Sequence, residues 1–407
     1  MTVTKRTYPE LSRRIYLDYA ATTPLAPEVM EAMKPYFSEK FGNASSIHRF
    51  GQEARTAVEQ ARESVARAIG AKPSEIVFTG SGTEADNLAI IGGALGSRRS
   101  HPNKKRIIVS AIEHEAIHES ANFLKTLGLP SERNVFLVET IGVDRYGGVD
   151  ESTFEACLGD DTALVSIMLV NNEVGTIQSI ARLSALAHHH GALFHTDAIQ
   201  AVGKIPVNVD ELGVDLLSLS AHKFYGPKGI GALYIRDGVD VEAILHGGGQ
   251  ERGRRSGTTP VPLIVGLGAA IELAISKMEE ETAHAMKLRN RLVQSALRER
   301  ELFSDIIVNG HPQYSVPNIV SISFPFERYK LDGDALIMAL DVEGIAVTSS
   351  AACSSGALRV SHVLLAMGLN EPTAKATIRF SFGRWTTEDE IDEAVQVLEK
   401  VIGRLKG

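Results

Sequence analysis

Short apolar runs alternate with amphipathic segments through the first half of the chain. Strands are predicted at residues 75–79, 106–110, 135–138, 163–170, 192–195, 216–220 and 231–235. Helices are predicted between them, at residues 84–95 and 113–127. Apolar strands separated by helices are typical of a mostly parallel sheet that is covered on both faces. In such a sheet, the loops after the carboxyl ends of the strands form the ligand crevice.

The second half has a different pattern. Residues 262–302, rich in Ala, Glu and Leu, predict one long helix or two helices end to end. Further strands are predicted at residues 318–324 and 376–381, and further helices at 332–341 and 387–405. We therefore expect a large α/β domain at residues 15–262 and a smaller α+β domain at 263–407. Residues 1–14 would form an N-terminal arm.

Composition limits the class of protein. A chain of 407 residues exceeds what one hydrophobic core usually supports, which agrees with two domains. The formal net charge of -8 does not favour binding to nucleic acid or to an anionic membrane. Two cysteines, Cys157 and Cys353, are too few for a disulfide framework and fit a reducing compartment. No signal-peptide core and no stretch of membrane-spanning length is identified, so a cytoplasmic location is expected.

A lysine follows one of the predicted strands directly. Lys223 ends the motif Ser220 to Lys223, which begins as the strand at residues 216–220 ends. Desolvation at the crevice would disfavour the ammonium form, so this lysine could be a neutral nucleophile that condenses with an aldehyde. The alternative is a solvated lysine at a loop edge. We interpret Lys228, a few residues further on, in that way.

A carboxylate follows another predicted strand. Asp197 comes just after residues 192–195 and could hold a pyridine nitrogen protonated, which makes the ring an electron sink. Gln200, three residues on, would share a helical face with it and reach the ring's phenolic oxygen. The alternative, of similar weight, is that Asp197 caps a helix beginning at Ala198.

A glycine-rich turn follows the strand at residues 75–79. Residues 79–85 contain two glycines and several hydroxyl groups at the start of a predicted helix. Free backbone N–H groups and the helix dipole favour a phosphate there, although a glycine-rich turn with a threonine N-cap is also common. The spacing is neither a Walker loop nor a dinucleotide fingerprint. Together, the three strand ends suit one aldehyde cofactor that carries a phosphate, a pyridine nitrogen and a phenolic oxygen.

The lysine motif and several further motifs along the chain resemble those of a known family. Residues 220–229 resemble the lysine motif of class V aminotransferase-fold enzymes, and the whole chain is similar to the NifS/IscS-type cysteine desulfurases. Further matching motifs occur in the same order at residues 16–24, 41–43, 171–175, 246–253, 255–258, 377–380 and 380–384. The resemblance implies the PLP-dependent transferase fold (aspartate aminotransferase-like), with pyridoxal 5'-phosphate as the cofactor.

The resemblance also implies roles for single residues. Lys223 would hold the cofactor covalently and move protons, and His114 would stack on the ring and assist proton transfer. Asp197 and Gln200 would take the roles described above. Arg379 would hold the substrate carboxylate with Asn172, because its planar fork binds both oxygens. The remaining cofactor contacts implied are Asn172 itself, Gly82, Thr83, Ser220 and His222, with Thr258 reaching the phosphate in a neighbouring subunit of a homodimer.

Cys353 is implied to be the residue that receives sulfur. It lies among small residues at 348–357, which predict a mobile loop. The expected reaction converts L-cysteine to L-alanine, leaves a persulfide on Cys353, and passes sulfur to an acceptor protein for iron–sulfur clusters or thio-cofactors. Cys157, next to apolar residues, fits an inert buried thiol.

Other interpretations stay open. A selenocysteine lyase or a small aminotransferase could use the same scaffold, and a sulfur-carrier or assembly scaffold could have lost catalysis. Three consecutive histidines, His188, His189 and His190, point in different directions at a helix end. We interpret them as a solvated helix terminus, and no metal site is expected.

Overall fold

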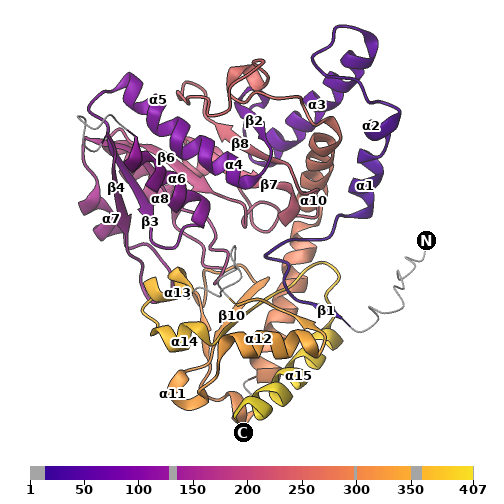
Figure 1. The fold of residues 1–407 in the computed structure, drawn as a ribbon, viewed down its shortest axis with the longest axis vertical. Helices are drawn as coiled ribbons and strands as arrows, with labels where there is room; N and C mark the ends of the chain where they lie inside the picture. The colour runs from indigo at the N-terminus through magenta and orange to yellow at the C-terminus, as the bar shows by residue number, and fades with distance from the viewer. Residues whose placement is uncertain (1–13, 128–134, 298–299, 350–359, 407) are drawn as a thin grey trace.

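A computed structural model describes residues 14–127, 135–297, 300–349 and 360–406. Within these ranges the chain forms a seven-stranded sheet, a three-stranded sheet and a two-stranded pair. Figure 1 shows the large sheet with its helices in the upper part and the small sheet in the lower part. The long helix α10 (Val261–Asn290) runs from one part to the other.

The large sheet is mostly parallel, as predicted. Its strands, in spatial order, are β2 (Ile76–Thr79), β8 (Gly231–Ile235), β7 (Leu216–Ser220), β6 (Leu193–Asp197), β5 (Thr162–Ser166), β3 (Arg106–Ser110) and β4 (Leu137–Ile141). Only β8 runs against its neighbours. The prediction was wrong in extent for β4, which begins at Leu137, and for β5, which leaves the sheet after Ser166.

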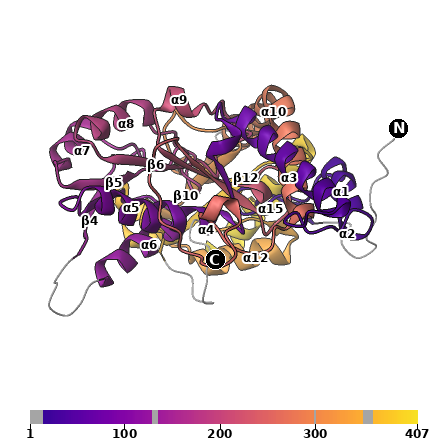
Figure 2. The ribbon, with the colours of Figure 1, turned by 90° about the horizontal axis from the view of Figure 1, so that it is seen from above.

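Helices cover both faces of this sheet (Figure 2). Successive strand residues point to opposite faces, so Leu217 packs in the cluster that includes α3, α8 and α10, while Leu216 packs in the cluster that includes α4, α5 and α6. Burial on both faces explains why apolar residues in these strands occur on both faces and do not simply alternate with polar ones. The helices are α3 (Arg49–Ala68), α4 (Gly82–Asn87), α5 (Gly93–Ser100), α6 (Glu115–Thr126) and α8 (Ile180–His189).

Helix α10 differs from its prediction in two respects. It ends at Asn290 and passes into a π-helical segment, Arg291–Leu297, instead of continuing to residue 302. Residues 261–294 are also long and apolar enough to cross a membrane, although we expected no such stretch. In the fold, Leu267 packs in the core cluster of the large sheet and Leu288 in that of the small sheet. Burial at both ends accounts for the apolar composition, and the domain boundary at residue 262 stays a prediction.

The small sheet is antiparallel. Its spatial order is β12 (Thr377–Ser381), β10 (Ile319–Ser323) and β9 (Ile307–Asn309), and it shares a hydrophobic cluster with α12 (Gly333–Val342) and α15 (Glu388–Lys406). The N-terminal strand β1 (Ile15–Tyr16) pairs with β11 (Ile345–Ala346) beside this sheet. The remaining helices are α1 (Pro27–Met33), α2 (Pro35–Ser38), α7 (Glu151–Cys157), α9 (Val209–Leu212), α11 (Phe326–Tyr329), α13 (His362–Ala366) and α14 (Glu371–Lys375).

A buried ion pair fixes the segment that follows β8. Arg62 on α3 donates to both carboxylate oxygens of Glu251, at 2.8 and 2.9 Å. The two side chains are 4% and 8% exposed. Glu251 also accepts the backbone N–H of Phe78 at 2.9 Å. The pair therefore ties the glycine-rich segment 246–253 to strand β2.

We expect Glu251→Ala to lower the free energy of unfolding by about 3 kcal/mol, because it leaves the Arg62 guanidinium buried without its carboxylate. Urea denaturation followed by circular dichroism measures this change. The control is Arg49→Ala, which removes an exposed ion pair with Glu53 and should leave stability nearly unchanged. Equal effects of the two substitutions would contradict the importance of the buried pair.

Candidate active site

The carboxyl ends of the parallel strands surround one cavity. Its volume is about 530 Å³, and segments after β2, β3, β5, β6 and β7 line it. The predicted site residues that line it are Gly82, Thr83, His114, Asn172, Asp197, Gln200, Ser220, His222, Lys223 and Arg379. Residues far apart in the sequence thus meet because parallel strands end at the same edge of the sheet.

Lys223 lies at the wall of this cavity and is mostly buried. Its Nζ donates to the carbonyl oxygens of Ala20 and Ala21, at 2.6 and 2.8 Å. Burial, followed by the positive charge of Arg379, lowers its pKa to about 8. A substantial fraction of this amine is therefore neutral near neutral pH, as a nucleophile toward an aldehyde requires. A solvated lysine at a loop edge does not describe this side chain.

Asp197 ends strand β6 and faces the same cavity. Its Oδ1 accepts the backbone N–H of Ile199 at 2.8 Å, which resembles the predicted cap. However, residues 198–204 form turns and no helix, so Gln200 does not share a helical face with Asp197 as we expected. Gln200 reaches the cavity by another route, with its Nε2 donating to the carbonyl oxygen of Ala20 at 2.8 Å.

The carboxyl group of Asp197 lies in an apolar, desolvated setting. Burial raises its pKa, while a backbone hydrogen bond from Ile199 and the charges of His114 and Lys223 oppose the shift. No lysine or arginine forms an ion pair with Asp197 among the residues that the structure describes. A cation bound in the cavity would therefore find a carboxylate ready to stabilise it.

A buried pair beneath Asp197 was missed from the sequence. Asp86 lines the cavity with 1% exposure, and neither carboxyl oxygen has a hydrogen-bond partner in the described part of the chain. His195 Nε2 lies 3.8 Å from Asp86 Oδ1 and 2.9 Å from the Ser218 hydroxyl. Burial raises the pKa of Asp86 well above its usual range and lowers that of His195 to about 3. The strand pattern could have indicated His195, because it lies two residues before Asp197 on one strand and therefore points to the same face of the sheet.

The glycine-rich turn fits close against its neighbours. A Cβ added at Gly82 would lie 2.3 Å from Ile199 Cδ1, so a larger residue there would require the Ile199 side chain to move. The N-cap of α4 is Ser81, whose hydroxyl accepts the N–H of Glu84 at 3.1 Å, and not a threonine as in the alternative interpretation. The Glu84 carboxylate binds Gly80 N–H at 2.8 Å and Arg255 Nε at 2.7 Å. The turn is therefore held rigidly from both sides.

A histidine and a lysine stand near this turn. His222 Nδ1 lies 3.1 Å from the Thr22 hydroxyl. Burial, followed by the charge of Lys223, lowers the His222 pKa to about 4, so the ring is neutral at pH 7. Lys228 is exposed, as expected for a solvated lysine, but it also lines the cavity, which the sequence did not indicate. Thr258 is exposed and lies outside the cavity lining; its contact with a second subunit stays a prediction.

Arg379 comes from β12, in the small sheet. Its Nη1 donates to the carbonyl oxygen of Asn172, and its Nη2 to Asp18 Oδ1, both at 2.8 Å. The side chain is 4% exposed, and its Nε has no hydrogen-bond partner in the described residues. Asp18, which orients the guanidinium, was not identified from the sequence because it is 361 residues away.

Cys353 lies outside the described residues, in the gap at 350–359. The residues on both sides of the gap make defined contacts, and one of their partners, Arg379, lines the cavity. Before it, Thr348 and Arg379 exchange backbone hydrogen bonds. After it, the Ser361 hydroxyl donates to Glu173 Oε2 at 2.5 Å, and His362 Nε2 lies 2.9 Å from the carbonyl oxygen of Glu113.

The other cysteine and the histidine run lie elsewhere. Cys157 is a partly buried free thiol, and burial followed by Glu139 raises its pKa, which disfavours the reactive thiolate. His188 and His189 are exposed at the end of α8, as expected for a solvated helix terminus. His188 Nε2 also lies 2.8 Å from Asp215 Oδ2, and this hydrogen bond raises its pKa. Within the described ranges, no group of three potential His, Cys, Asp or Glu ligands could hold a metal.

Comparison with known proteins agrees with this geometry. The chain is 48% identical to "Cysteine desulfurase IscS" of Dictyoglomus turgidum over 396 residues, which cover 97% of this chain and 96% of that protein. A solved "NifS-like protein" is 39% identical with a TM-score of 0.86, covering 96% of this chain and all of that one. A structure titled "SspA in complex with cysteine" is 36% identical with a TM-score of 0.75, covering 91% and 99% of the two chains.

These similarities extend over both sheets and not only over the lysine motif. The family described as "Aminotransferase class-V" matches residues 15–394, which include every strand of the large sheet and also β12 with Arg379. The chain therefore belongs to the class V aminotransferase family and has its α/β transferase fold.

Proposed function

We propose that this protein is a pyridoxal-phosphate-dependent cysteine desulfurase, which releases L-alanine from L-cysteine and leaves the sulfur on Cys353. One observation carries the proposal. Lys223, Asp197 and the Gly82–Thr83 turn open into a single cavity that also contains Arg379. The relatives named cysteine desulfurase match nearly the whole chain, and the cysteine complex of a related structure supports the same substrate.

The residues present fit the cofactor. Asp197 is a buried carboxylate without a cationic side-chain partner in the described residues, as a protonated pyridine nitrogen would need. The absence of a side chain at Gly82 allows the turn to pack closely beside Ile199 and Ser220. When bound, pyridoxal phosphate supplies an electron-withdrawing ring that stabilises negative charge at the substrate α-carbon. Lys223 would hold it covalently and Gln200 and His114 would contact its ring, while Gly82, Thr83, Ser220 and His222 would hold its phosphate.

Arg379 and Asn172 would bind the carboxylate of L-cysteine. The guanidinium is held in place by Asp18 and by the Asn172 carbonyl, so little side-chain freedom is lost when a substrate binds. Arginine suits this task because its planar fork presents several N–H donors to a carboxylate. The buried setting strengthens the interaction and keeps water from competing for it.

Lys223 and His114 would move the protons. The low pKa of Lys223, about 8, lets its amine take a proton from the substrate α-carbon and return one later. Burial also lowers the pKa of His114, whose Nδ1 accepts the N–H of Ala116 at 3.1 Å. His114 therefore stands in the cavity as a neutral imidazole of fixed orientation.

Cys353 would perform the sulfur transfer. Its thiolate attacks the sulfur of the bound substrate; an S–S bond forms, the carbon–sulfur bond breaks, and its electron pair stays with the three-carbon fragment, which takes up protons and leaves as alanine. The outer sulfur of the persulfide then passes to an acceptor protein, for iron–sulfur clusters or thio-cofactors. We place this reaction in a cytoplasmic homodimer in which Thr258 reaches the phosphate site of the second subunit.

We expect Cys353→Ser to reduce alanine release from L-cysteine at least about 1,000-fold, because the sulfur acceptor is removed, while the visible absorption of the cofactor persists. Alanine is assayed without any keto acid, which also separates a desulfurase from an aminotransferase. The matched control is Cys157→Ser, which should retain activity. Unchanged turnover in the Cys353 variant would exclude this thiol from the reaction.

We expect Lys223→Ala to abolish the covalent attachment of the cofactor after borohydride reduction, since no other amine would form the bond. Mass spectrometry of the intact protein measures the added mass. Lys34→Ala, which removes an exposed lysine of 71% exposure, should still show the adduct. An adduct of full yield on the Lys223 variant would mean that another lysine is the anchor.

The pH dependence of cofactor attachment follows from the Lys223 pKa. Only the neutral amine attacks an aldehyde, and this amine becomes neutral above a pKa of about 8. We therefore expect the rate at which cofactor-free protein develops its visible band with pyridoxal phosphate to rise through pH 8 and to level off above it. Stopped-flow absorbance measures the rate. A rate that keeps rising to the pKa of a solvated lysine, about 10.4, would contradict the effect of burial.

A further inference from the structure

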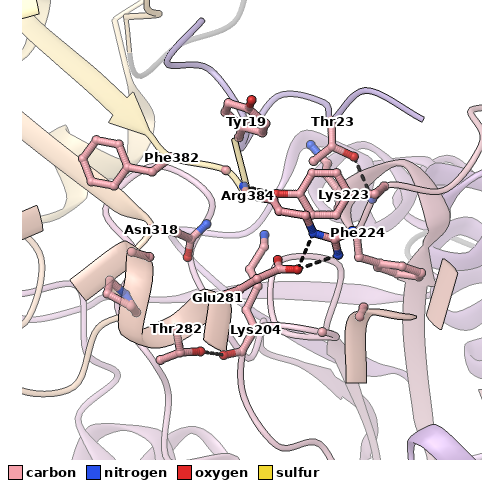
Figure 3. Close-up of a pocket in the computed structure, with 16 residues that line it drawn as sticks. Tyr19, Thr23, Lys204, Lys223, Phe224, Glu281, Thr282, Asn318, Phe382 and Arg384 are labelled. Atoms are coloured by element: carbon pink, nitrogen blue, oxygen red, sulfur yellow. Dashed lines mark hydrogen bonds and ion pairs between the residues drawn. The ribbon is translucent and has the colours of Figure 1, made fainter. Parts of the chain in front are cut away.

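A second, smaller cavity lies beside the first and shares Lys223 with it. Its volume is about 40 Å³, which is enough for a few water molecules at most. Figure 3 shows the side chain of Lys204 directed between those of Asn318 and Glu281 in this cavity. The Glu281 carboxylate is engaged by Arg384 Nε at 2.7 Å. Lys204 is therefore a second amine near the active site, with no role in the mechanism described above.

The strongest contact of Lys204 leads back to the active site. Its Nζ donates to Gln200 Oε1 at 2.6 Å, and its backbone carbonyl accepts the Thr282 hydroxyl at 3.2 Å. Glu281 and Asn318 line the same small cavity but form no direct hydrogen bond with the Lys204 ammonium among the described contacts. Gln200 thus connects Lys204 to the larger cavity, because it hydrogen-bonds to Lys204 and lines that cavity.

This contact favours one orientation of the Gln200 amide. In its protonated form Lys204 can only donate, so it selects the amide oxygen. Burial, followed by the charge of Lys223, lowers the Lys204 pKa to about 7, so this form predominates below that pH. The amide nitrogen then donates one of its two hydrogens to the Ala20 carbonyl, at 2.8 Å, and keeps the other. The two ends of a glutamine amide have nearly the same shape, so packing alone does not distinguish them. Lys204 therefore acts together with the Ala20 carbonyl, which can only accept, in holding the amide in this orientation.

We propose that Lys204 is a positioning residue that fixes the Gln200 amide, so that Gln200 presents an N–H donor to the phenolic oxygen of pyridoxal phosphate. The proposal rests on the proposed function, because it requires that cofactor in the larger cavity. Gln200 makes the contact, and Lys204, together with the Ala20 carbonyl, fixes the orientation of its amide. A presented oxygen would repel the electron-rich phenolic oxygen, so the orientation affects both cofactor affinity and the electronic state of the ring.

A double-mutant cycle tests the coupling of the two residues. The dissociation constant of pyridoxal phosphate is measured by absorbance titration of cofactor-free, full-length protein for Lys204→Met, Gln200→Leu and the double variant. We expect about tenfold weaker binding and a displaced visible band for each single variant. The double variant should bind no more weakly than Gln200→Leu alone. Losses that multiply in the double variant, or an unchanged affinity and spectrum in Lys204→Met, would overturn the proposal.

Two further variants separate positioning from general stability. Lys204→Arg keeps a donor-only group and should preserve the spectrum of the bound cofactor, whereas a spectrum like that of Lys204→Met would count against the proposal. Lys277→Met, which removes an exposed lysine of α10 paired with Glu280, should leave affinity unchanged. If the unaltered protein fails to bind pyridoxal phosphate, the proposed function fails; if it binds and Lys204→Met binds equally well, only the role of Lys204 fails.

Discussion

The parallel pairing of β5, β6 and β7 is the constraint on which the site depends. Its register places His195 beside Leu216 and Asp197 beside Ser218, and it aligns the ends of these strands at one edge. Polar side chains that line the cavity lie at or just after the ends of these strands, as Asp197 does for β6 and Lys223 for β7. Because the strand interiors are buried on both faces, they tolerate few polar residues, and the chemistry is concentrated where the strands end.

Burial then selects which of the acidic groups is charged. Burial raises the pKa of Glu113 to about 8 and that of Asp86 well above its usual range, so both carboxyl groups favour the neutral form. Burial also raises the pKa of Asp197, but the backbone hydrogen bond from Ile199 and the charge of Lys223 work against that shift. A cation bound in the cavity would therefore be stabilised mainly by Asp197. Of the three carboxyl groups, Asp197 is thus the one whose neighbours most oppose the rise in pKa caused by burial.

The sequence identified the polar residues that follow the strands, but it did not identify their tertiary contacts. β3, β7 and β8 matched their predicted ranges because each contains a short run of apolar residues bounded by polar residues or glycine. Lys223 and Asp197 could be identified because the strand-end rule acts locally. Asp18 and Lys204 could not, since one pairs with a residue from the far end of the chain and the other acts through a neighbouring turn. The expected helix after Asp197 gave way to turns there, and local pattern does not determine such a choice.

The segment from Leu17 to Thr23 connects the two halves of the site. Toward the small sheet, Ala20 N–H donates to the Ser381 hydroxyl at 2.8 Å, and Asp18 holds Arg379. Toward the large sheet, the Ala20 carbonyl accepts both Lys223 Nζ and Gln200 Nε2. One short segment therefore sets the distance between two groups. These are Arg379, which would bind the substrate carboxylate, and Lys223, whose amine would act at the substrate α-carbon. Since catalysis by positioning loses its effect with errors of about 1 Å, this backbone link contributes to the chemistry although it provides no reacting atom.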